Sequence, residues 1–246
     1  MANRSGSRGG KVSHPSFAPP LGVFVLFSLL TVAVIAVDVE AIGPNGTSVG
    51  LAMLNGSIQR IIGVNWMLYS ATEIGGLIPI ASMGVFFVVG VVQLVRGRGI
   101  RRVDKAIIML GAAYVVMLVL YVGFDKIAIN YRPVLVDGAL EPSYPSSHSL
   151  LSVGALGCAI VWAKARLKGG ARTGVVAGSA IVAALIVVGR LFSGVHWFTD
   201  ILAGVLLGLS IALAYGYFVA ELRYREPVRG RHARRDSYDA DNVFLR

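Results

Sequence analysis

The sequence alternates long apolar stretches with short polar connections. Six predominantly apolar stretches of 15 to 22 residues contain no Asp, Glu, Lys or Arg: 21–37, 74–95, 106–124, 149–163, 173–189 and 201–220. About 20 apolar residues in an α-helix cross the roughly 30 Å hydrocarbon core of a membrane. Helices buried in a soluble bundle would carry a polar stripe, which these stretches lack. The pattern therefore predicts an all-α, polytopic membrane protein with six transmembrane helices.

Composition agrees with this prediction, and the placement of charge adds an orientation. The chain has 246 residues, of which 55% are hydrophobic and 15% charged. Its net charge of +10 would suggest nucleic acid as the partner of a soluble protein. However, 19 of the 23 Lys and Arg residues lie in four segments beside the apolar stretches, 1–20, 96–105, 164–172 and 222–246. Membrane proteins keep such residues on the cytoplasmic side. We therefore expect both termini in the cytoplasm (N-in/C-in), membrane lipids as partners, and no binding of nucleic acid.

Both ends of the chain are polar and basic. Residues 1–20 combine Ser, Gly and Pro with three basic residues and lack the apolar core of a signal peptide. Residues 222–246 carry seven arginines. We predict two disordered arms flanking a single six-helix membrane domain, residues 21–221. The only cysteine, Cys158, lies in an apolar stretch and is predicted to fill the core.

The first connection on the predicted outer side spans residues 43–73 and is too long for a turn. Its larger apolar side chains recur at helical spacing: Ile58, Ile61, Ile62, Trp66 and Tyr69. This spacing predicts a short interfacial helix with its aromatic rings in the headgroup region. Such a helix could form one wall of a lipid entrance or simply cover the bundle, and the sequence leaves both roles open.

The second and third outer connections concentrate the ionisable groups. Residues 123–147 contain three prolines that exclude a continuous helix, and Ser146 or Ser147 is a suitable N-cap for the fourth apolar helix. The free N–H groups of a helix's first turn favour an anion. In the third connection, a helix beginning near Ser193 would make His196 and Asp200 neighbours at i and i+4. The carboxylate would then hold one imidazole nitrogen, and the other nitrogen would face the site.

Three short motifs follow one another through these connections. They are Arg132-Pro133, then Pro145-Ser146-Ser147-His148, then Arg190-x5-His196-x3-Asp200. Together they resemble the signature of the type 2 phosphatidic acid phosphatase (PAP2) superfamily, which reads Lys-x6-Arg-Pro, Pro-Ser-Gly-His and Ser-Arg-x5-His-x3-Asp. Three positions depart from it. Lys126 stands one residue late, with Asp125 in its place, and Ser147 and Gly189 replace the Gly and the Ser.

Residue chemistry and the resemblance indicate the same reaction. Two guanidinium forks, Arg132 and Arg190, suit the oxygens of a phosphate. A neutral His196 oriented by Asp200 can attack phosphorus, and a protonated His148 can donate to the leaving oxygen. The resemblance implies these roles, with phosphate binding by Arg132, Arg190, Ser147 and Lys126. We expect no metal and no other cofactor, because the cations around His148, His196 and Asp200 favour an anion over zinc.

Two classes of function remain open at this level. The first is a membrane phosphatase that hydrolyses a lipid phosphate or isoprenoid diphosphate through a phosphohistidine, with its site at the outer leaflet of the cell membrane. The second is a lipid-phosphate binding or transport protein that uses the same cationic pocket without hydrolysis. The vanadate-binding haloperoxidase branch of the superfamily ranks last, since its members are typically soluble.

Overall fold

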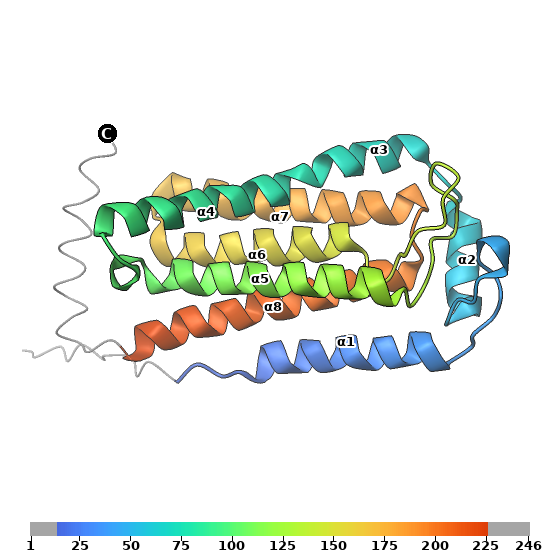
Figure 1. The fold of residues 1–246 in the computed structure, drawn as a ribbon, viewed down its shortest axis with the longest axis horizontal. Coiled ribbons are helices and arrows are strands. Elements are labelled where there is room, and N and C mark those ends of the chain that lie inside the picture. Colours follow the sequence, from blue (N-terminus) through green and yellow to red (C-terminus); the bar gives the residue numbers. More distant parts are fainter. Residues whose placement is uncertain (1–13, 226–246) are drawn as a thin grey trace, which may run out of the picture.

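A computed structural model describes residues 14–225, and this part of the chain is almost entirely helical. The helices are α1 (Ala18–Ala36), η1 (Pro44–Gly46), α2 (Ala52–Ile62), α3 (Trp66–Gly75), α4 (Leu77–Gly97), η2 (Ile100–Arg102), α5 (Lys105–Ile127), α6 (Ser147–Arg166), α7 (Gly169–Ser193) and α8 (Phe198–Arg225). Figure 1 shows the long helices running side by side, with α2 across one end of the bundle. The predicted all-α fold is confirmed.

Within residues 14–225, six helices are long and apolar enough to cross a membrane. They are Ala18–Ala36, Trp66–Gly97, Lys105–Ile127, Ser147–Arg166, Gly169–Ser193 and Phe198–Arg225. Each covers one of the six charge-free stretches, the first of them except for its last residue, Val37. Their outward faces expose large apolar side chains, such as Phe87 at 71% and Val119 at 64%. A surface of this kind suits lipid rather than water, and the prediction of six membrane helices is confirmed.

Two helix ends differ from the predicted domain limits. Helix α1 begins at Ala18, with Pro19 and Pro20 in its first turn, so the predicted arm is too long at 1–20. Proline is tolerated there because the first N–H groups of a helix have no intrahelical partner. Helix α8 continues to Arg225, which pairs with Glu221 one turn earlier, so the predicted tail from 222 begins too early. The remaining parts of both predicted arms, 1–13 and 226–246, lie outside the described residues.

The central pair of helices is α6 and α8, which pack with their backbones in contact. A Cβ atom on Gly204 would lie 2.5 Å from the carbonyl oxygen of Ser146, and one on Gly208 would lie 2.7 Å from that of Leu150. Glycine is required at both positions, because any larger residue would push the helices apart. The N-terminal ends of α6 and α8 therefore meet, and the Ser146 N–H donates to the Asp200 carbonyl oxygen at 3.0 Å. The second and third motifs thus adjoin.

The first outer connection differs from its prediction. The expected single helix is broken at residues 63–65, where Gly63 has a left-handed φ of 67° and Asn65 caps the next helix by accepting from the Leu68 N–H. Trp66 and Tyr69 therefore belong to α3, which runs on into α4 as one 32-residue span. The short helix is α2 alone. Its location in the headgroup region stays a prediction.

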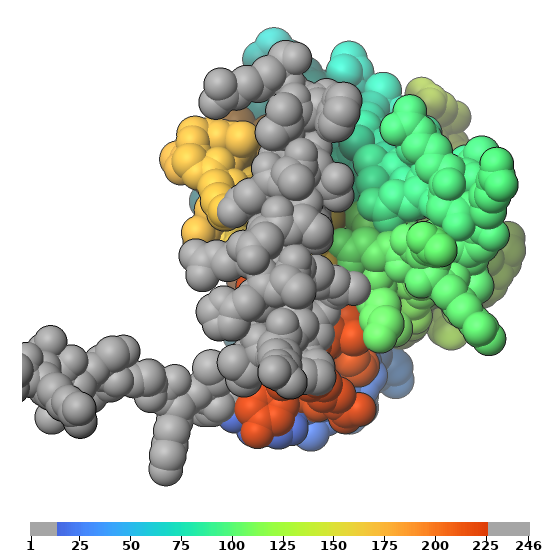
Figure 2. Space-filling view, turned by 90° about the vertical axis from the view of Figure 1, so that its left-hand side faces the viewer, coloured from blue at the N-terminus to red at the C-terminus, as the bar shows by residue number. Residues whose placement is uncertain are grey.

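The two ends of the bundle carry different connections. In Figure 1 the connections 37–65, 128–146 and 194–197 gather at one end. Figure 2 shows the opposite end, where the α4–α5 connection, the α6–α7 connection and the end of α8 face the viewer. Those segments hold Arg98, Arg101, Arg102 and Lys168. The orientation of the two ends in a membrane stays a prediction from this charge distribution.

Candidate active site

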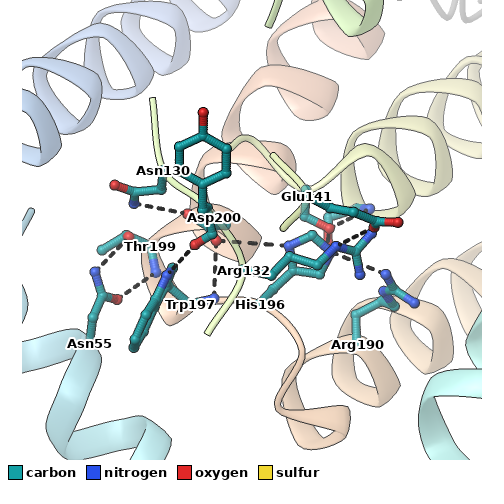
Figure 3. Close-up of polar contacts among 12 residues, drawn as sticks. Asn55, Asn130, Arg132, Glu141, Arg190, His196, Trp197, Thr199 and Asp200 are labelled. Atoms are coloured by element: carbon teal, nitrogen blue, oxygen red, sulfur yellow. Dashed lines mark hydrogen bonds and ion pairs between the residues drawn. The ribbon is translucent and has the colours of Figure 1, made fainter. Parts of the chain in front are cut away.

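Arg190 and His196 face each other at the end of α7. Arg190 lies in the last turn of this helix with its side chain fully buried, and α7 stops at Gly194, whose left-handed φ of 66° turns the chain back. His196 follows in the connection, 3% exposed, with its Nε2 3.1 Å from Arg190 Nη2 (Figure 3). A guanidinium can only donate, so Nε2 must accept. His196 therefore carries its proton on Nδ1, and the Nε2 lone pair faces the arginine.

Asp200 is held behind His196. Its Oδ2 lies 3.8 Å from His196 Nδ1 and accepts the Trp197 N–H at 3.0 Å, while its Oδ1 accepts from Asn130 Nδ2 at 3.3 Å. The prediction that a helix begins near Ser193 is wrong, because α7 ends there and α8 begins at Phe198. The connection nevertheless folds so that the i and i+4 side chains face each other. The carboxylate is thus on the Nδ1 side of the imidazole.

The environment of His196 keeps its ring neutral. Burial lowers the pKa of His196 well below its ordinary value of 6.5, and the positive charges of Arg132 and Arg190 lower it further. A neutral imidazole retains the Nε2 lone pair that a nucleophile needs.

This lowered pKa predicts a loss of stability in acid. Below pH 6.5 the unfolded chain protonates His196 while the folded protein does not, so the free energy of unfolding falls as the pH drops toward the folded-state pKa. The contribution of this one group is about 2 kcal/mol between pH 7.5 and pH 5. Thermal unfolding of detergent-solubilised protein should show it as a steeper acid decline in wild type than in His196→Gln. Equal declines would contradict a buried, neutral His196.

Arg132 lies in the segment after α5, which pairs with the chain on its way back to α6. The Arg132 N–H donates to the Glu141 carbonyl oxygen at 3.0 Å, and Arg132 Nε lies 3.0 Å from Glu141 Oε2. Within residues 14–225 its buried Nη1 has no hydrogen-bond partner. Both guanidinium groups lie over the Tyr69 ring, that of Arg132 5.9 Å and that of Arg190 5.1 Å from the ring centroid. Both arginines therefore belong to one cationic cluster.

His148 is the second residue of α6. Of the two N-caps considered from the sequence, Ser146 is the one observed, since its side chain accepts from the Ser149 N–H. His148 Nε2 lies 3.5 Å from Glu73 Oε2 of α3, and its buried Nδ1 has no hydrogen-bond partner among the residues described. The structure thus places His148 at the same end of the bundle as His196.

A cavity of about 320 Å³ adjoins this cluster. Its polar lining includes Arg132, Ser147 and His196, and its apolar lining includes Tyr121 and Phe124 of α5. Asp125 and Glu141 add two carboxylates to the lining, so the charge that faces the cavity is mixed.

Lys126 is the one predicted phosphate-binding residue that the structure does not bring to this cluster. Its side chain is 80% exposed and lies 3.7 Å from Asp125. Asp125, which stands at the lysine position of the motif, lines the cavity instead. The shift by one residue turns Lys126 to another face of α5, about 100° away.

Sequence reasoning missed the residues that α2 and α3 add to the site. Glu73 Oε1 lies 2.8 Å from Arg190 Nη1, and Thr72 Oγ1 accepts from the same nitrogen at 3.4 Å. Asn55 of α2 accepts from the Thr199 N–H at 3.2 Å and donates to the Thr199 hydroxyl at 2.9 Å, which fixes the start of α8 (Figure 3). The available signal was an acidic residue, Glu73, at the border of an apolar stretch.

The fold and the site together define a class: a helical membrane protein with a buried cationic cluster and two histidines at one end. Residues 124–224, which include all three motifs, match the family model of the PAP2 superfamily. The resemblance to this superfamily seen in the motifs is confirmed over these residues. At the family level it supports a phosphatase.

A solved structure agrees with this assignment. The chain is similar to the crystal structure of a transmembrane PAP2-type phosphatidylglycerolphosphate phosphatase from Bacillus subtilis, with a TM-score of 0.56 and 18% sequence identity. The match covers 82% of this chain and 96% of that chain. At this identity the likeness concerns the fold. Comparison with curated proteins finds no match.

Proposed function

We propose that the protein is a membrane phosphatase that hydrolyses a lipid phosphate or isoprenoid diphosphate through a phosphohistidine on His196. The observation that carries this proposal is the 3.1 Å contact between His196 Nε2 and Arg190 Nη2, because it requires a neutral imidazole with its lone pair beside a buried cation. A phosphoryl oxygen bound by Arg190 would bring phosphorus within reach of that lone pair.

The reaction has two steps. In the first, His196 Nε2 forms a bond to phosphorus while the P–O bond to the leaving group breaks, and His148 gives its proton to that oxygen. The positive charge that develops on the His196 ring is stabilised by Asp200 on the Nδ1 side, 3.8 Å away. In the second step water attacks phosphorus, His148 takes its proton, and the P–N bond breaks. Phosphate leaves and His196 is neutral again.

Arg132, Arg190 and Ser147 are the residues proposed to bind the phosphoryl oxygens. Arg132 has a buried Nη1 without a hydrogen-bond partner in the described part of the chain, and the same holds for Nε of Arg190. Guanidinium groups that approach from different elements can neutralise the charge that spreads over the oxygens in the transition state. A role for Lys126 has no support in its position.

A lipid is the substrate class that fits the surroundings. Tyr121, Phe124 and Leu150 give the cavity an apolar side next to Arg132 and His196. The structural neighbour is described as a phosphatidylglycerolphosphate phosphatase, which makes that lipid the first compound to test. Since the basic connections lie at the other end of the bundle, the positive-inside rule supports a site on the extracytoplasmic side of the cell membrane.

One observation favours non-hydrolytic binding or transport as the second candidate. The carboxylate of Glu73 pairs with Arg190 at 2.8 Å, which opposes the binding of a phosphoryl group at that guanidinium. Weaker binding of the phosphoryl group would ease the release of an intact lipid, which a transport protein needs and a hydrolase does not.

A phosphate-release panel tests the proposed function. Purified protein in detergent is given phosphatidylglycerol phosphate, phosphatidic acid and undecaprenyl diphosphate, with and without EDTA. We expect release from at least one lipid at a rate that the chelator leaves unchanged, because the proposed chemistry uses two histidines and no metal. Absence of release from all three lipids would favour the binding or transport protein, and inhibition by EDTA would contradict a metal-independent reaction.

A further inference from the structure

The carboxylate of Glu73 contacts two functional groups at once. Its Oε1 lies 2.8 Å from Arg190 Nη1, and its Oε2 lies 3.5 Å from His148 Nε2. One side chain of α3 thus bridges the arginine beside the proposed nucleophile and the proposed general acid. The Glu73 side chain is 39% exposed, so it can move without disrupting the core.

Two glycines give α3 room to approach. A Cβ atom on Gly189 would lie 2.6 Å from the Thr72 methyl carbon, and one on Gly76 would lie 2.5 Å from His148 Cδ2. Gly189 stands where the superfamily motif has serine, and Thr72 Oγ1 accepts from Arg190 Nη1 at 3.4 Å. A serine at position 189 would collide with Thr72, so the glycine lets this part of α3 approach, which places Glu73 in the site as well.

A phosphoryl group and Glu73 compete for the same guanidinium. Both are anions, and two anions held at one cation repel each other. Binding of the substrate at Arg190 therefore weakens the contact of Glu73 with this arginine. The other carboxylate oxygen already lies beside His148 Nε2, so the negative charge can remain next to the imidazole.

The charges around His148 give this carboxylate a function. The charged groups that face His148 are Glu73 of α3, Arg190 of α7 and Arg132 of the 128–146 segment, with the His196 ring close by. The two arginines disfavour a second positive charge on His148, whereas the carboxylate favours it. Among these neighbours in the described chain, Glu73 is the carboxylate that can keep His148 protonated.

We propose that Glu73 is a positioning residue that pairs with Arg190 in the substrate-free site and with His148 once a phosphoryl group occupies Arg190. Once substrate occupies Arg190, Glu73 is free to stabilise the protonated form of His148, which is the proton donor. The site binds the anion less tightly as a result, because Glu73 competes with it for Arg190. This inference rests on the proposed phosphatase function and adds to it a residue from outside the three motifs.

The variant Glu73→Gln tests the inference with steady-state kinetics between pH 5 and pH 9, using the lipid most active in the panel. Without the competing charge, the inhibition constant of inorganic phosphate should fall about tenfold. Without the Glu73 carboxylate, the protonated form of His148 is less stable. We therefore expect kcat at pH 8 to fall about tenfold and the alkaline limb of the kcat profile to move to lower pH by about one unit. Glu73→Asp, which keeps the charge, should return the limb toward wild type.

Glu141→Gln is the matched control, because Glu141 pairs with Arg132 through the same type of ion pair, 3.0 Å long. It should alter phosphate inhibition and leave the alkaline limb in place. An unchanged limb and unchanged phosphate inhibition in Glu73→Gln, with wild type active, would overturn the role of Glu73. An inactive wild type would instead overturn the phosphatase. Should Glu73→Gln not fold, the same two measurements on Glu73→Ser decide.

Discussion

Phosphate release from the preferred lipid should fall by about 10⁴-fold or more when His196 is replaced by Gln. His196 is proposed to act as a unit with the acid His148 and the orienting carboxylate of Asp200. Removing the nucleophile of such a unit eliminates nearly all of the rate enhancement except the part that substrate binding supplies. The amide of Gln keeps the size of the side chain and its contact with Arg190, but it has no lone pair that can form a stable bond to phosphorus. The measurement is initial phosphate release at saturating lipid, together with incorporation of labelled phosphate into the protein.

His14→Gln is the matched control for this substitution. His14 pairs with Glu221 at 3.5 Å and is 57% exposed, at the opposite end of the bundle. The variant His14→Gln should keep wild-type activity. This result would show that the loss of activity in His196→Gln depends on where His196 lies, since removing an imidazole elsewhere has no effect. Activity of His196→Gln within tenfold of wild type would contradict a phosphohistidine at this residue.

The membrane-spanning helices are the part of the structure that can be predicted most directly from the sequence. Each span is an uninterrupted apolar stretch, because lipid-facing helices can place almost no charge in the hydrocarbon region at any face. The ends were harder to predict, since Pro19 and Pro20 suggest a break although the first turn of a helix accepts them. Helix α8 extends past the end of the charge-free stretch at Ala220 to Arg225, whose ion pair with Glu221 stabilises its last turn.

The site was only partly predictable, for a geometrical reason. Local motifs name Arg190, His196 and Asp200, because these residues lie within one connection and two helix ends. Glu73 reaches the same place from more than 100 residues away, and that contact depends on the break at Gly63, the run of α3 into α4 and the room at Gly189. No local pattern encodes this combination. The tautomer of His196 likewise follows from a tertiary contact, the donor facing Nε2.

Replacing His148 with Gln should lower phosphate release from a lipid by about 10³-fold and should affect an aryl phosphate far less. A general acid contributes roughly 10² to 10⁴ by protonating the leaving oxygen. An alkoxide needs that proton, whereas p-nitrophenolate leaves without it. With p-nitrophenyl phosphate the first step should therefore stay fast in His148→Gln, as measured by the burst of p-nitrophenol.

The second step separates this role from a merely structural one. His148 is also proposed to take the proton of the attacking water, so His148→Gln should accumulate phosphohistidine on His196 when p-nitrophenyl phosphate is the substrate. Labelled phosphate should remain on the protein in base and be lost in acid, as expected for a P–N bond, and the double variant His148→Gln, His196→Gln should carry none. Equal losses with the lipid and the aryl phosphate, without accumulation, would show that His148 supports the site without donating a proton. His148 lies at the start of α6, and His196 lies two residues before the start of α8. Because the glycines of α8 bring these two helix starts together, this pair of measurements tests whether that packing builds one reaction centre.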